Sequence, residues 1–560
     1  MYGPWNPGIR SRIPKELQHL STIFRPENVF TDIAAVRELQ GLTGFSSSEL
    51  VAFRPQRLAL HELLIRVTAD FAVPDGSRIG DLGINFRQIA SRLFERHLAP
   101  RMDELDAAFT HARRSLRIAI ETTLSELAPQ RGWGPAQIAA CESRAAMSEG
   151  SQEKTACGAL ARVMSALFAT QGSAWGTREL IISMAADMAG NDYGSDCIGR
   201  TIEPLLLHAA DSEGYRLLPR QERPVVINTK GPSAAGKSTL RPLQKKLAGD
   251  VGVEWRDFAL ISPDIWRKQL LEYGSLGDAY KYAGAFTAEE LQIVDQKLDR
   301  HMARKHRRGD MTHLLIDRFR FDSFAADSDE AGSNLLTRFG QTVYLFFLIT
   351  PPESLVERAW KRGLEFGRYK AVDDTLAHAV EAYTGIPDVF FTWVRRSDKR
   401  IQFEFLDNTV RLGERPRTVA FGDNHTFNIL DVTGALNIER YGRVNVNAAA
   451  PEFLYSDRAL LAPEHNTRFL RRCIAGFHAV NFADQATGRI YLRIESGAPV
   501  CIDAALLQVA IADGDTLSGV QAVAPGALRG DVAQAAGPQY LHGGGTGRGT
   551  TLGQWGGARG

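Results

Sequence analysis

The chain has 560 residues, of which 44% are hydrophobic and 23% charged, and its formal net charge is +1. This length predicts two to four domains, and the balanced charge argues against binding of nucleic acid or membrane by overall electrostatics. The five cysteines form no C-x-x-C pair, which argues against a disulfide framework or a zinc site and favours a reducing, cytoplasmic compartment. The N-terminus lacks the layout of a secretory signal, and no apolar run is long enough to cross a bilayer, so we expect no membrane partner; export as an effector stays open.

Residues 1–220 are predicted to form a mostly helical accessory domain. Leu58, Leu63 and Val67 lie near helical spacing, and Ala-rich, charged stretches follow. The Gly- and Asp-containing segment 190–194 is expected to interrupt the helices. His61 lies in an apolar segment and is expected to be either a packed or a surface histidine rather than a catalytic one. The region is either a plain accessory domain or a module that binds a partner, regulates the chain or covers a substrate.

Residues 221–435 alternate strand-like and helix-like runs, the pattern of an α/β fold with a doubly wound parallel sheet. A long helix is predicted from Thr287, which would form a capping box with Glu290. The expected strands are 225–228, 258–261, 313–316, 343–349 and 401–406.

The end of the chain changes character. Residues 436–536 mix short apolar stretches with short helical patterns and predict a small α+β region. Residues 537–560 are glycine-rich and contain no acidic residue, so we expect a disordered tail.

The stretch after the first expected strand fits the phosphate-binding pattern G-x-x-x-x-G-K-[ST]. In such a loop, backbone N–H groups and a helix start surround phosphate oxygens, which predicts ATP binding. Lys237 is expected to reach the β- and γ-phosphates, and the Ser238 hydroxyl to ligate Mg²⁺. Pro242 should kink or shorten the following helix. The residues of the loop are Gly231, Pro232, Ser233, Ala234, Ala235, Gly236, Lys237, Ser238 and Thr239.

Acidic and basic residues follow the next two strands. Asp264 comes after the second strand, where ligands bind in open α/β sheets, and could accept the proton of an attacking hydroxyl or cap a helix. Arg267, one turn on, is a candidate to hold the acceptor. Asp317 ends the third strand and could orient Mg²⁺ or form a sheet-edge salt bridge. The basic residues beside it, Arg318 and Arg320, could bind an anionic acceptor.

A basic segment follows the fourth strand. Arg358 and Arg362 lie at i, i+4 on one helix face, and Gly363, Gly367 and Arg368 come next. A helix that is broken by glycines and carries arginines is typical of a mobile lid that closes over a transferring phosphate. The alternative is a solvated helix face.

These stretches together resemble the zeta-toxin family of P-loop kinases over about residues 222–410. The matching features are the loop 231–239, the Asp264-x-x-Arg267 step, the long helix from Thr287, the acidic residue after the third strand and the arginines of 358–368. The resemblance implies transfer of the γ-phosphate of ATP, with Mg²⁺, to a sugar hydroxyl, typically the 3′-hydroxyl of UDP-N-acetylglucosamine. A similar group of plant-pathogen effectors phosphorylates NAD.

The resemblance also assigns roles. It implies Lys237 on the phosphates, Ser238 on Mg²⁺ and Asp264 as the base. It implies an inhibitory, antitoxin-like partner. The implied lid arginines are Arg358, Arg362 and Arg368.

The acceptor and two other classes of function stay open. Where the family has a Glu-Gly-Thr-x-Arg stretch, this chain has Asp317-Arg318-Phe319-Arg320-Phe321, so the acceptor is a nucleotide-sugar, NAD or a nucleoside. A polynucleotide 5′-kinase would need a basic channel, for which the pairs 307–308 and 471–472 are the only hints. A non-catalytic, ATP-binding regulatory module is the other alternative. We expect a small-molecule kinase and no nucleic-acid partner.

Overall fold

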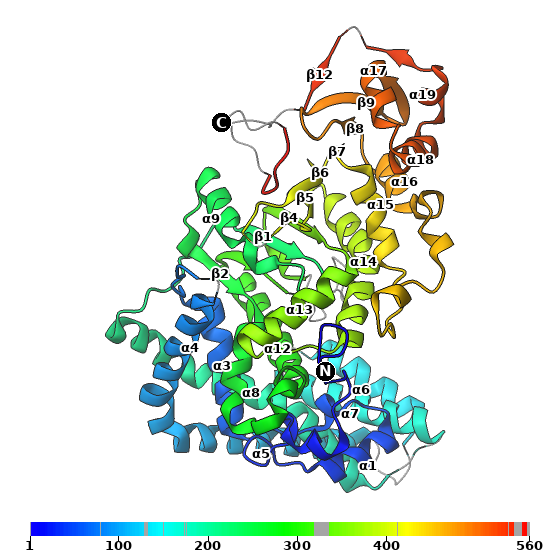
Figure 1. The fold of residues 1–560 in the computed structure, drawn as a ribbon. Coiled ribbons are helices and arrows are strands. Elements are labelled where there is room, and N and C mark those ends of the chain that lie inside the picture. Colours follow the sequence, from blue (N-terminus) through cyan, green and yellow to red (C-terminus); the bar gives the residue numbers. More distant parts are fainter. Residues whose placement is uncertain are drawn as a thin grey trace. The chain divides into compact units, whose positions relative to one another are not determined.

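The computed structural model of the chain describes residues 2–78, 80–127, 133–148, 151–172, 174, 176–318, 335–411, 413–535, 537–541 and 551–556 (Figure 1). The chain forms two compact units. Unit 1 consists of Met1–Arg12, Leu218–Ser262 and Asp299–Gly560, and unit 2 consists of Ile13–Leu217 and Pro263–Leu298. Helices and a large sheet are both present, which confirms the predicted α/β class. None of the helices in the described ranges combines the length and apolar character that a membrane span needs.

Unit 2 is helical, as the sequence of residues 1–220 predicted. Its helix α3 (Pro55–Asp70) is buried along most of its length, including the titratable residues Arg57, His61 and Glu62. The helix α12 (Ala288–Arg308) begins in this unit and ends in unit 1. The other helices are α1 (Ile33–Thr43), α2 (Ser47–Leu50), α3 (Pro55–Asp70), α4 (Asp81–Leu93), α5 (Met102–Leu127), α6 (Pro135–Met147), α7 (Ser151–Gln171), α8 (Arg178–Glu213), α10 (Arg267–Leu270) and α11 (Ala283–Phe286).

The predicted break at residues 190–194 is wrong, because α8 continues through it. Gly194 packs against the ring of Phe109, which would lie 2.7 Å from a β-carbon at that position. Asn191 is buried, and its side-chain amide donates to the Val51 carbonyl at 2.6 Å. These residues allow close packing inside the bundle, and they do not form a turn.

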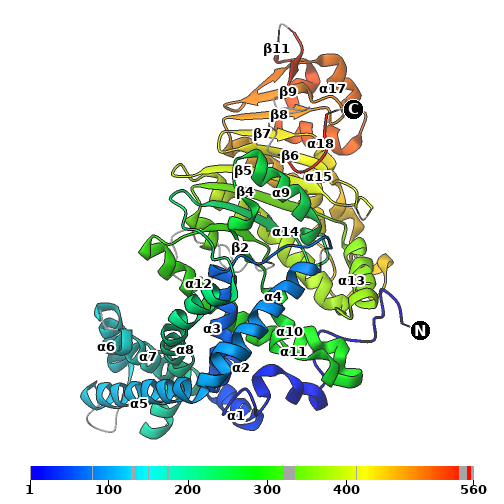
Figure 2. The ribbon, with the colours of Figure 1, turned by 90° about the vertical axis from the view of Figure 1, so that its left-hand side faces the viewer.

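Unit 1 is built on one sheet of twelve described strands, in which β12 pairs with β9 beside the main strand order. The successive strands from β4 to β9 can be followed in Figure 2. The five strands expected from the sequence are all present at the predicted positions. They form a parallel block in the order β2-β3-β1-β4-β5. The strands are β1 (Val225–Lys230), β2 (Phe258–Ile261), β3 (His313–Ile316), β4 (Thr342–Ile349), β5 (Arg400–Asp407), β6 (Arg417–Asp423), β7 (Thr426–Ile429), β8 (Ala479–Ala483), β9 (Arg489–Glu495), β10 (Ala498–Cys501), β11 (Ala533–Gln534) and β12 (Gln539–Tyr540).

The strand β1 lies where the direction of strand order reverses. From β1 the chain moves outward to β2, returns to β3 beside β1, and then crosses to β4 on the other side of β1. Ligands of open α/β sheets bind outside the carboxyl ends of strands at such a reversal. The segment directly after β1 therefore occupies the favoured ligand position of this sheet.

The strands after residue 435 continue the same sheet. β8 pairs in parallel with β7, and β9 pairs antiparallel with β8. The α+β content expected for residues 436–536 is present, but its strands extend the core sheet. The helices of unit 1 besides α12 are α9 (Arg241–Asp250), α13 (Pro352–Phe366), α14 (Val372–Val394), α15 (Val432–Tyr441), α16 (Arg468–Gly476), α17 (Ala504–Ala510), α18 (Gly514–Val523) and α19 (Pro525–Arg529).

Aromatic side chains fill the space between the sheet and helices α14 and α16. Phe390 of α14 is fully buried and packs against Phe403 and Phe405 of β5, with ring centroids 4.8 and 5.2 Å apart. Phe469 of α16 joins the same cluster, 5.5 Å from Phe405. Side chains alternate along a strand, so Glu404, between the two β5 phenylalanines, points to the opposite face of the sheet.

On that opposite face lies the segment 551–556, which composition had assigned to a disordered tail. Leu552 and Gly553 donate their backbone N–H groups to the Glu404 carboxylate at 2.5 and 2.9 Å. Leu552 is 2% exposed, so this part of the tail is packed, and the prediction of disorder is wrong for it. The parts of the tail outside the described residues are 542–550 and 557–560.

Candidate functional site

The loop between β1 and α9 has a curled backbone that few side chains permit. Gly236 is left-handed with a φ of 94°, and a β-carbon there would collide with the side-chain amide of Asn408. Ala234 also has a positive φ, 66°, a strain that persists only where the surroundings fix it and that is common at functional sites. The N–H of Ala235 closes a turn onto the Pro232 carbonyl at 3.2 Å. The loop is therefore a tight curl, as the motif requires.

Lys237 folds back onto this curl. Its ammonium donates to the carbonyls of Gly231 (3.1 Å) and Pro232 (3.2 Å) at the start of the loop. The side chain is half-buried, so its charge stays within reach of solvent. A phosphate group would be a stronger, charged partner for the same N–H groups. This position is compatible with the role expected of Lys237.

The helix after the loop starts late, as Pro242 predicted. Lys237–Leu240 form a 3-10 turn, and α9 begins directly after it with the proline in its first turn. A proline is tolerated there because its missing N–H has no intrahelical partner. The Thr239 hydroxyl donates to the Gly236 carbonyl at 2.6 Å. Of the two hydroxyl groups of the motif, that of Ser238 is therefore the candidate to ligate a metal ion.

Asn408, which belongs to none of the sequence motifs, holds the loop from the end of β5. Its side-chain amide donates to the Ala235 carbonyl at 2.6 Å, and its backbone N–H donates to the Ile349 carbonyl of β4 at 3.0 Å. It is buried, at 7% exposure. The available signal was its place directly after the fifth strand, at the carboxyl edge where ligands bind.

The lid segment differs from the predicted broken helix. α13 continues through Gly363 and ends at Gly367, whose φ of 66° closes the helix. Gly363 is buried because the ring of Tyr369 occupies the space of its missing side chain, 2.5 Å from the β-carbon position. The glycine at 363 therefore serves packing, and only the glycine at 367 ends the helix.

Arg358 of α13 lies beside the support of the loop. Its guanidinium donates to the carbonyls of Asn408 (2.6 Å) and Val410 (3.3 Å), and burial lowers its pKa. In this position it stabilises the segment that holds the loop. Arg362 and Arg368 are half-buried, on α13 and just beyond its end.

Asp317 directly follows β3, at the same edge of the sheet as the loop. Asn228 of β1 pairs with Ile316 of β3, so Asp317 lies beside the residues that lead into the loop. Its backbone N–H donates to the Ile261 carbonyl at the end of β2, at 2.9 Å. The carboxylate is half-buried.

The two basic residues expected beside Asp317 have different outcomes. Arg318 is 1% exposed and donates to Asp299 at 2.6 Å, so this buried ion pair removes it from the acceptor candidates. Arg320 lies outside the described residues.

Ser238 and Asp317 fit Mg²⁺ by their donor chemistry. Both offer hard oxygen ligands, and they follow two adjacent strands, β1 and β3. Mg²⁺ in nucleotide sites keeps several waters and takes one or two protein oxygens. Within the described part of the chain, no cluster of three or more His, Cys, Asp or Glu side chains is suited to a metal. The donor set therefore suits a nucleotide-bound Mg²⁺ better than a metal held by protein alone.

Asp264 and Arg267 lie in unit 2, in the short helical stretch after β2. Arg267 donates to the Asp264 carboxylate at 2.8 Å, to the Gly284 carbonyl at 2.6 Å and to the Thr287 hydroxyl at 2.7 Å. Three partners thus fix the arginine. The Asp264 side chain is 54% exposed and can still accept a hydrogen bond from a ligand.

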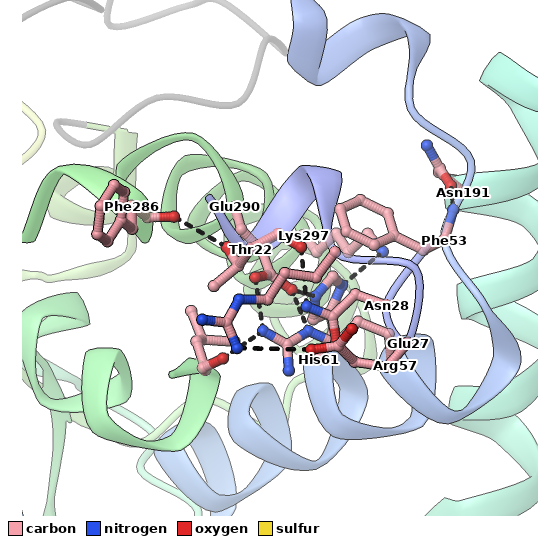
Figure 3. Close-up of polar contacts among 12 residues, drawn as sticks. Thr22, Glu27, Asn28, Phe53, Arg57, His61, Asn191, Phe286, Glu290 and Lys297 are labelled. Atoms are coloured by element: carbon pink, nitrogen blue, oxygen red, sulfur yellow. Dashed lines mark hydrogen bonds and ion pairs between the residues drawn. The ribbon is translucent and has the colours of Figure 1, made fainter. Parts of the chain in front are cut away.

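A buried group of charged residues lies elsewhere in unit 2 (Figure 3). The Glu290 carboxylate accepts from Arg57 at 2.5 and 2.7 Å and bonds to Nε2 of His61 at 2.7 Å. Lys297 lies 3.3 Å from Nδ1 of His61 and donates to the Ser195 hydroxyl at 3.1 Å. This group ties α3, α8 and α12 together within the unit.

The capping box predicted for Thr287 and Glu290 is wrong. The Thr287 hydroxyl donates backward to the Ala283 carbonyl at 3.1 Å, and the Glu290 carboxylate turns into the core towards Arg57. A basic partner compensates a buried carboxylate more fully than a helix N–H does. Burial alone would raise the pKa of Glu290, but Arg57 and His61 hold it well below its usual range.

His61 is neutral in this group. Burial lowers its pKa to about 4, and the charge of Lys297 acts in the same direction. Nε2–H therefore donates to Glu290, and Nδ1 accepts from Lys297. Its 0% exposure makes it a packed histidine, which is one of the two expected positions, and excludes the surface alternative.

Unit 1 thus brings together loop 231–239, Asp317 and Arg358, whereas Asp264 and Arg267 belong to unit 2. A loop of backbone amides with a lysine, a hydroxyl and a carboxylate suits a polyphosphate with a divalent cation. Comparison with known proteins finds no matching family model, curated protein or solved structure.

Proposed function

We propose that this protein is a P-loop phosphotransferase of the zeta-toxin type, which uses ATP and Mg²⁺ to phosphorylate a hydroxyl group of a small molecule. The supporting observation is the loop 231–239. It contains the full phosphate-binding motif and lies between β1 and α9, where the strand order reverses. The parallel block of unit 1 would be the doubly wound kinase core.

On the nucleotide side, the loop amides and Lys237 bind the β- and γ-phosphates. Lys237 exchanges its two carbonyl partners for phosphate oxygens. Asn408 already fixes the loop, so little reorganisation accompanies binding. Ser238 and Asp317 would hold Mg²⁺, whose charge offsets that of the phosphates.

On the acceptor side, Asp264 is the proposed base. Its carboxylate takes the proton of the attacking hydroxyl as the γ-phosphoryl group moves from ATP to that oxygen and ADP leaves. Arg267 orients the carboxylate from 2.8 Å. Arg362 and Arg368 are proposed to offset the charge of the transferring group, while Arg358 stabilises the support of the loop.

The acceptor is proposed to be a nucleotide-sugar such as UDP-N-acetylglucosamine, NAD or a nucleoside. Asp317 and Arg320 are its proposed contacts together with Arg267. An inhibitory, antitoxin-like partner belongs to the same proposal, since it comes from the same family resemblance.

The test is incubation of the purified chain with γ-labelled ATP, Mg²⁺ and each acceptor in parallel. Label should enter a small acceptor, and Lys237→Ala should abolish it. Lys246→Ala, which removes an exposed lysine of α9, is the matched control and should stay active. Binding of ATP without labelling of any acceptor would favour a non-catalytic regulatory module, and labelling of a 5′-hydroxyl oligonucleotide alone would favour a polynucleotide kinase.

A second pair of variants tests the base. Asp264→Asn should slow transfer by about 100- to 10,000-fold while ATP binding is unchanged. Asp278→Asn changes an exposed aspartate of the same unit and should transfer normally. Normal transfer by Asp264→Asn would remove this residue from the role of base.

A further inference from the structure

A pocket of about 420 Å³ opens beside α16 in unit 1. It shares no residue with the loop 231–239. Its volume lies within the range of small-molecule sites. Its lining follows one side of α16 and of the 3-10 turn Pro463–Asn466 before it, and includes Glu464, His465, Thr467, Arg468, Arg471 and Arg472.

Two of the lining arginines are available to bind an anionic ligand. Arg468 and Arg471 are exposed, and neither forms an ion pair with any residue that the structure describes. The charge of Arg468 also acts on the Glu439 carboxylate, where it opposes the rise in pKa that burial causes. Nε of Arg471 lies 3.3 Å from the Thr467 hydroxyl, to which it donates. Thr467 is itself 4% exposed, so Arg471 is oriented by a fixed partner while its terminal N–H groups remain for a ligand.

The third arginine is fixed from two sides. Arg472 pairs with Asp388 of α14 at 3.2 Å, and its guanidinium lies 4.4 Å from the centroid of the Phe391 ring. Arg395 stacks on the same ring at 4.9 Å. Stacking holds a guanidinium plane and leaves its N–H edges available for anions.

The groups of the pocket that attract an anion are side chains, and the backbone N–H groups at the start of α16 are not among them. The backbone N–H of Phe469, in the first turn, already donates to the Glu439 carboxylate. The anion-binding capacity of the pocket therefore resides in the guanidinium groups of Arg468, Arg471 and Arg472.

We propose that this pocket binds the phosphate group of a small phosphorylated molecule through Arg468 and Arg471, with Arg472 beside them. Paired guanidinium N–H groups match phosphate oxygens in geometry and charge. Because two of the arginines are held before binding, less side-chain entropy is lost when the ligand arrives. The site stands whether or not the chain is a kinase.

The neighbouring carboxylates favour a compact ligand. Glu464 lines the pocket and Asp388 lies at Arg472, so a phosphodiester chain crossing the arginines would meet negative charge. A small sugar phosphate instead places its phosphate on the arginines, and one of its hydroxyl groups can donate a hydrogen bond to the Glu464 carboxylate. The chemistry is therefore that of a phosphomonoester carrying hydroxyl groups.

The test uses ribose 5-phosphate and inorganic phosphate, titrated calorimetrically into the Lys237→Ala chain so that the loop contributes less. Ribose 5-phosphate should bind. The double variant Arg468→Ala with Arg471→Ala should lower the affinity for ribose 5-phosphate at least about 100-fold, because each charge-assisted hydrogen bond contributes roughly a factor of ten or more to the affinity. Arg458→Ala, an exposed arginine outside the pocket lining, is the matched control and should leave the affinity unchanged.

Two further variants separate charge from geometry. Arg468→Lys with Arg471→Lys keeps both charges and should still lose affinity, since lysine lacks the paired donors. Glu464→Gln should lower the affinity for ribose 5-phosphate more than the affinity for inorganic phosphate. The proposal is overturned if ribose 5-phosphate does not bind, if the double alanine variant binds it equally well, or if a single-stranded oligonucleotide is the tighter ligand of these arginines.

Discussion

Asn408 and Ala235 are joined by a hydrogen bond of 2.6 Å between the side-chain amide of one and the carbonyl of the other. The same amide borders the position that a β-carbon of Gly236 would take. Asn408 is itself fixed by the Ile349 carbonyl and by Arg358. The shape of the loop 231–239 therefore depends on residues from β4, α13 and the end of β5.

Replacing Asn408 by alanine should weaken ATP binding by about 5- to 100-fold. The change leaves the buried Ala235 carbonyl without its partner, which costs about 1–3 kcal/mol in the ordered form of the loop. Asn447→Ala, an exposed asparagine of the same unit, is the control. Titration of ATP binding checks this, and equal affinity in Asn408→Ala would show that the loop holds its shape without β5.

The strands and the loop could be predicted because each depends on local sequence. The apolar runs 258–261 and 313–316 are strands at the same residues. Long-range pairing of side chains has no local signal. Glu290 matched a capping pattern four residues long, but its partner Arg57 lies 233 positions earlier in the chain.

The helix breaks that glycines predicted were wrong for a different physical reason. Residues 190–194 and Gly363 were both expected to interrupt helices, and both lie inside helices. In each case a glycine makes room for an aromatic ring, Phe109 or Tyr369. Composition cannot separate a glycine that a turn requires from one that close packing requires.

Two glycines of α8 allow this distinction to be measured. A β-carbon at Gly199 would collide with the Glu62 carboxylate and lie 2.7 Å from Nη2 of Arg66, whereas nothing lies within 4 Å of one at Gly190. Gly199→Ala should lower the free energy of unfolding by about 1–3 kcal/mol. Gly190→Ala should raise it by about 0.5–1 kcal/mol through helix propensity. Denaturant unfolding followed by circular dichroism compares them, and equal changes would contradict this account of the packing.

The buried His61 predicts how acid affects unit 2. Its pKa in the folded chain is about 4, below its ordinary value of 6.5, so the unfolded chain binds the proton first as pH falls. The difference between the two pKa values stabilises the folded chain on the order of 3 kcal/mol in total. This contribution to the free energy of unfolding is complete above pH 6.5 and is lost as pH falls towards 4.

His61→Gln removes the titrating group from this site. The variant should be less stable than the wild type at about pH 7, and the difference in free energy of unfolding should shrink towards about pH 4.5. Urea titrations of both chains across this range measure it. A difference that stays constant with pH would contradict a neutral, buried His61.

A second titrating group lies under the segment 551–556. Burial raises the pKa of Glu404 to about 7, against hydrogen bonds from Thr418, Leu552 and Gly553. In the same segment, Trp555 stacks on Phe421 of β6 with ring centroids 4.8 Å apart. The carboxyl group is therefore packed most favourably when it is protonated.

The contact between Glu404 and the segment 551–556 should weaken as pH rises. Because the folded pKa lies above the ordinary value of 4.5, the stabilising contribution is complete below pH 4.5 and is lost as pH rises through about 7. Trp555 should accordingly become more exposed at about pH 8 than at about pH 5, measured as the fluorescence difference between the wild type and Trp555→Phe.

Glu404→Gln keeps a neutral side chain at both pH values and should abolish this fluorescence response. Glu414→Gln, an exposed glutamate of the same unit, should retain it. An unchanged response in Glu404→Gln would exclude Glu404 as its source.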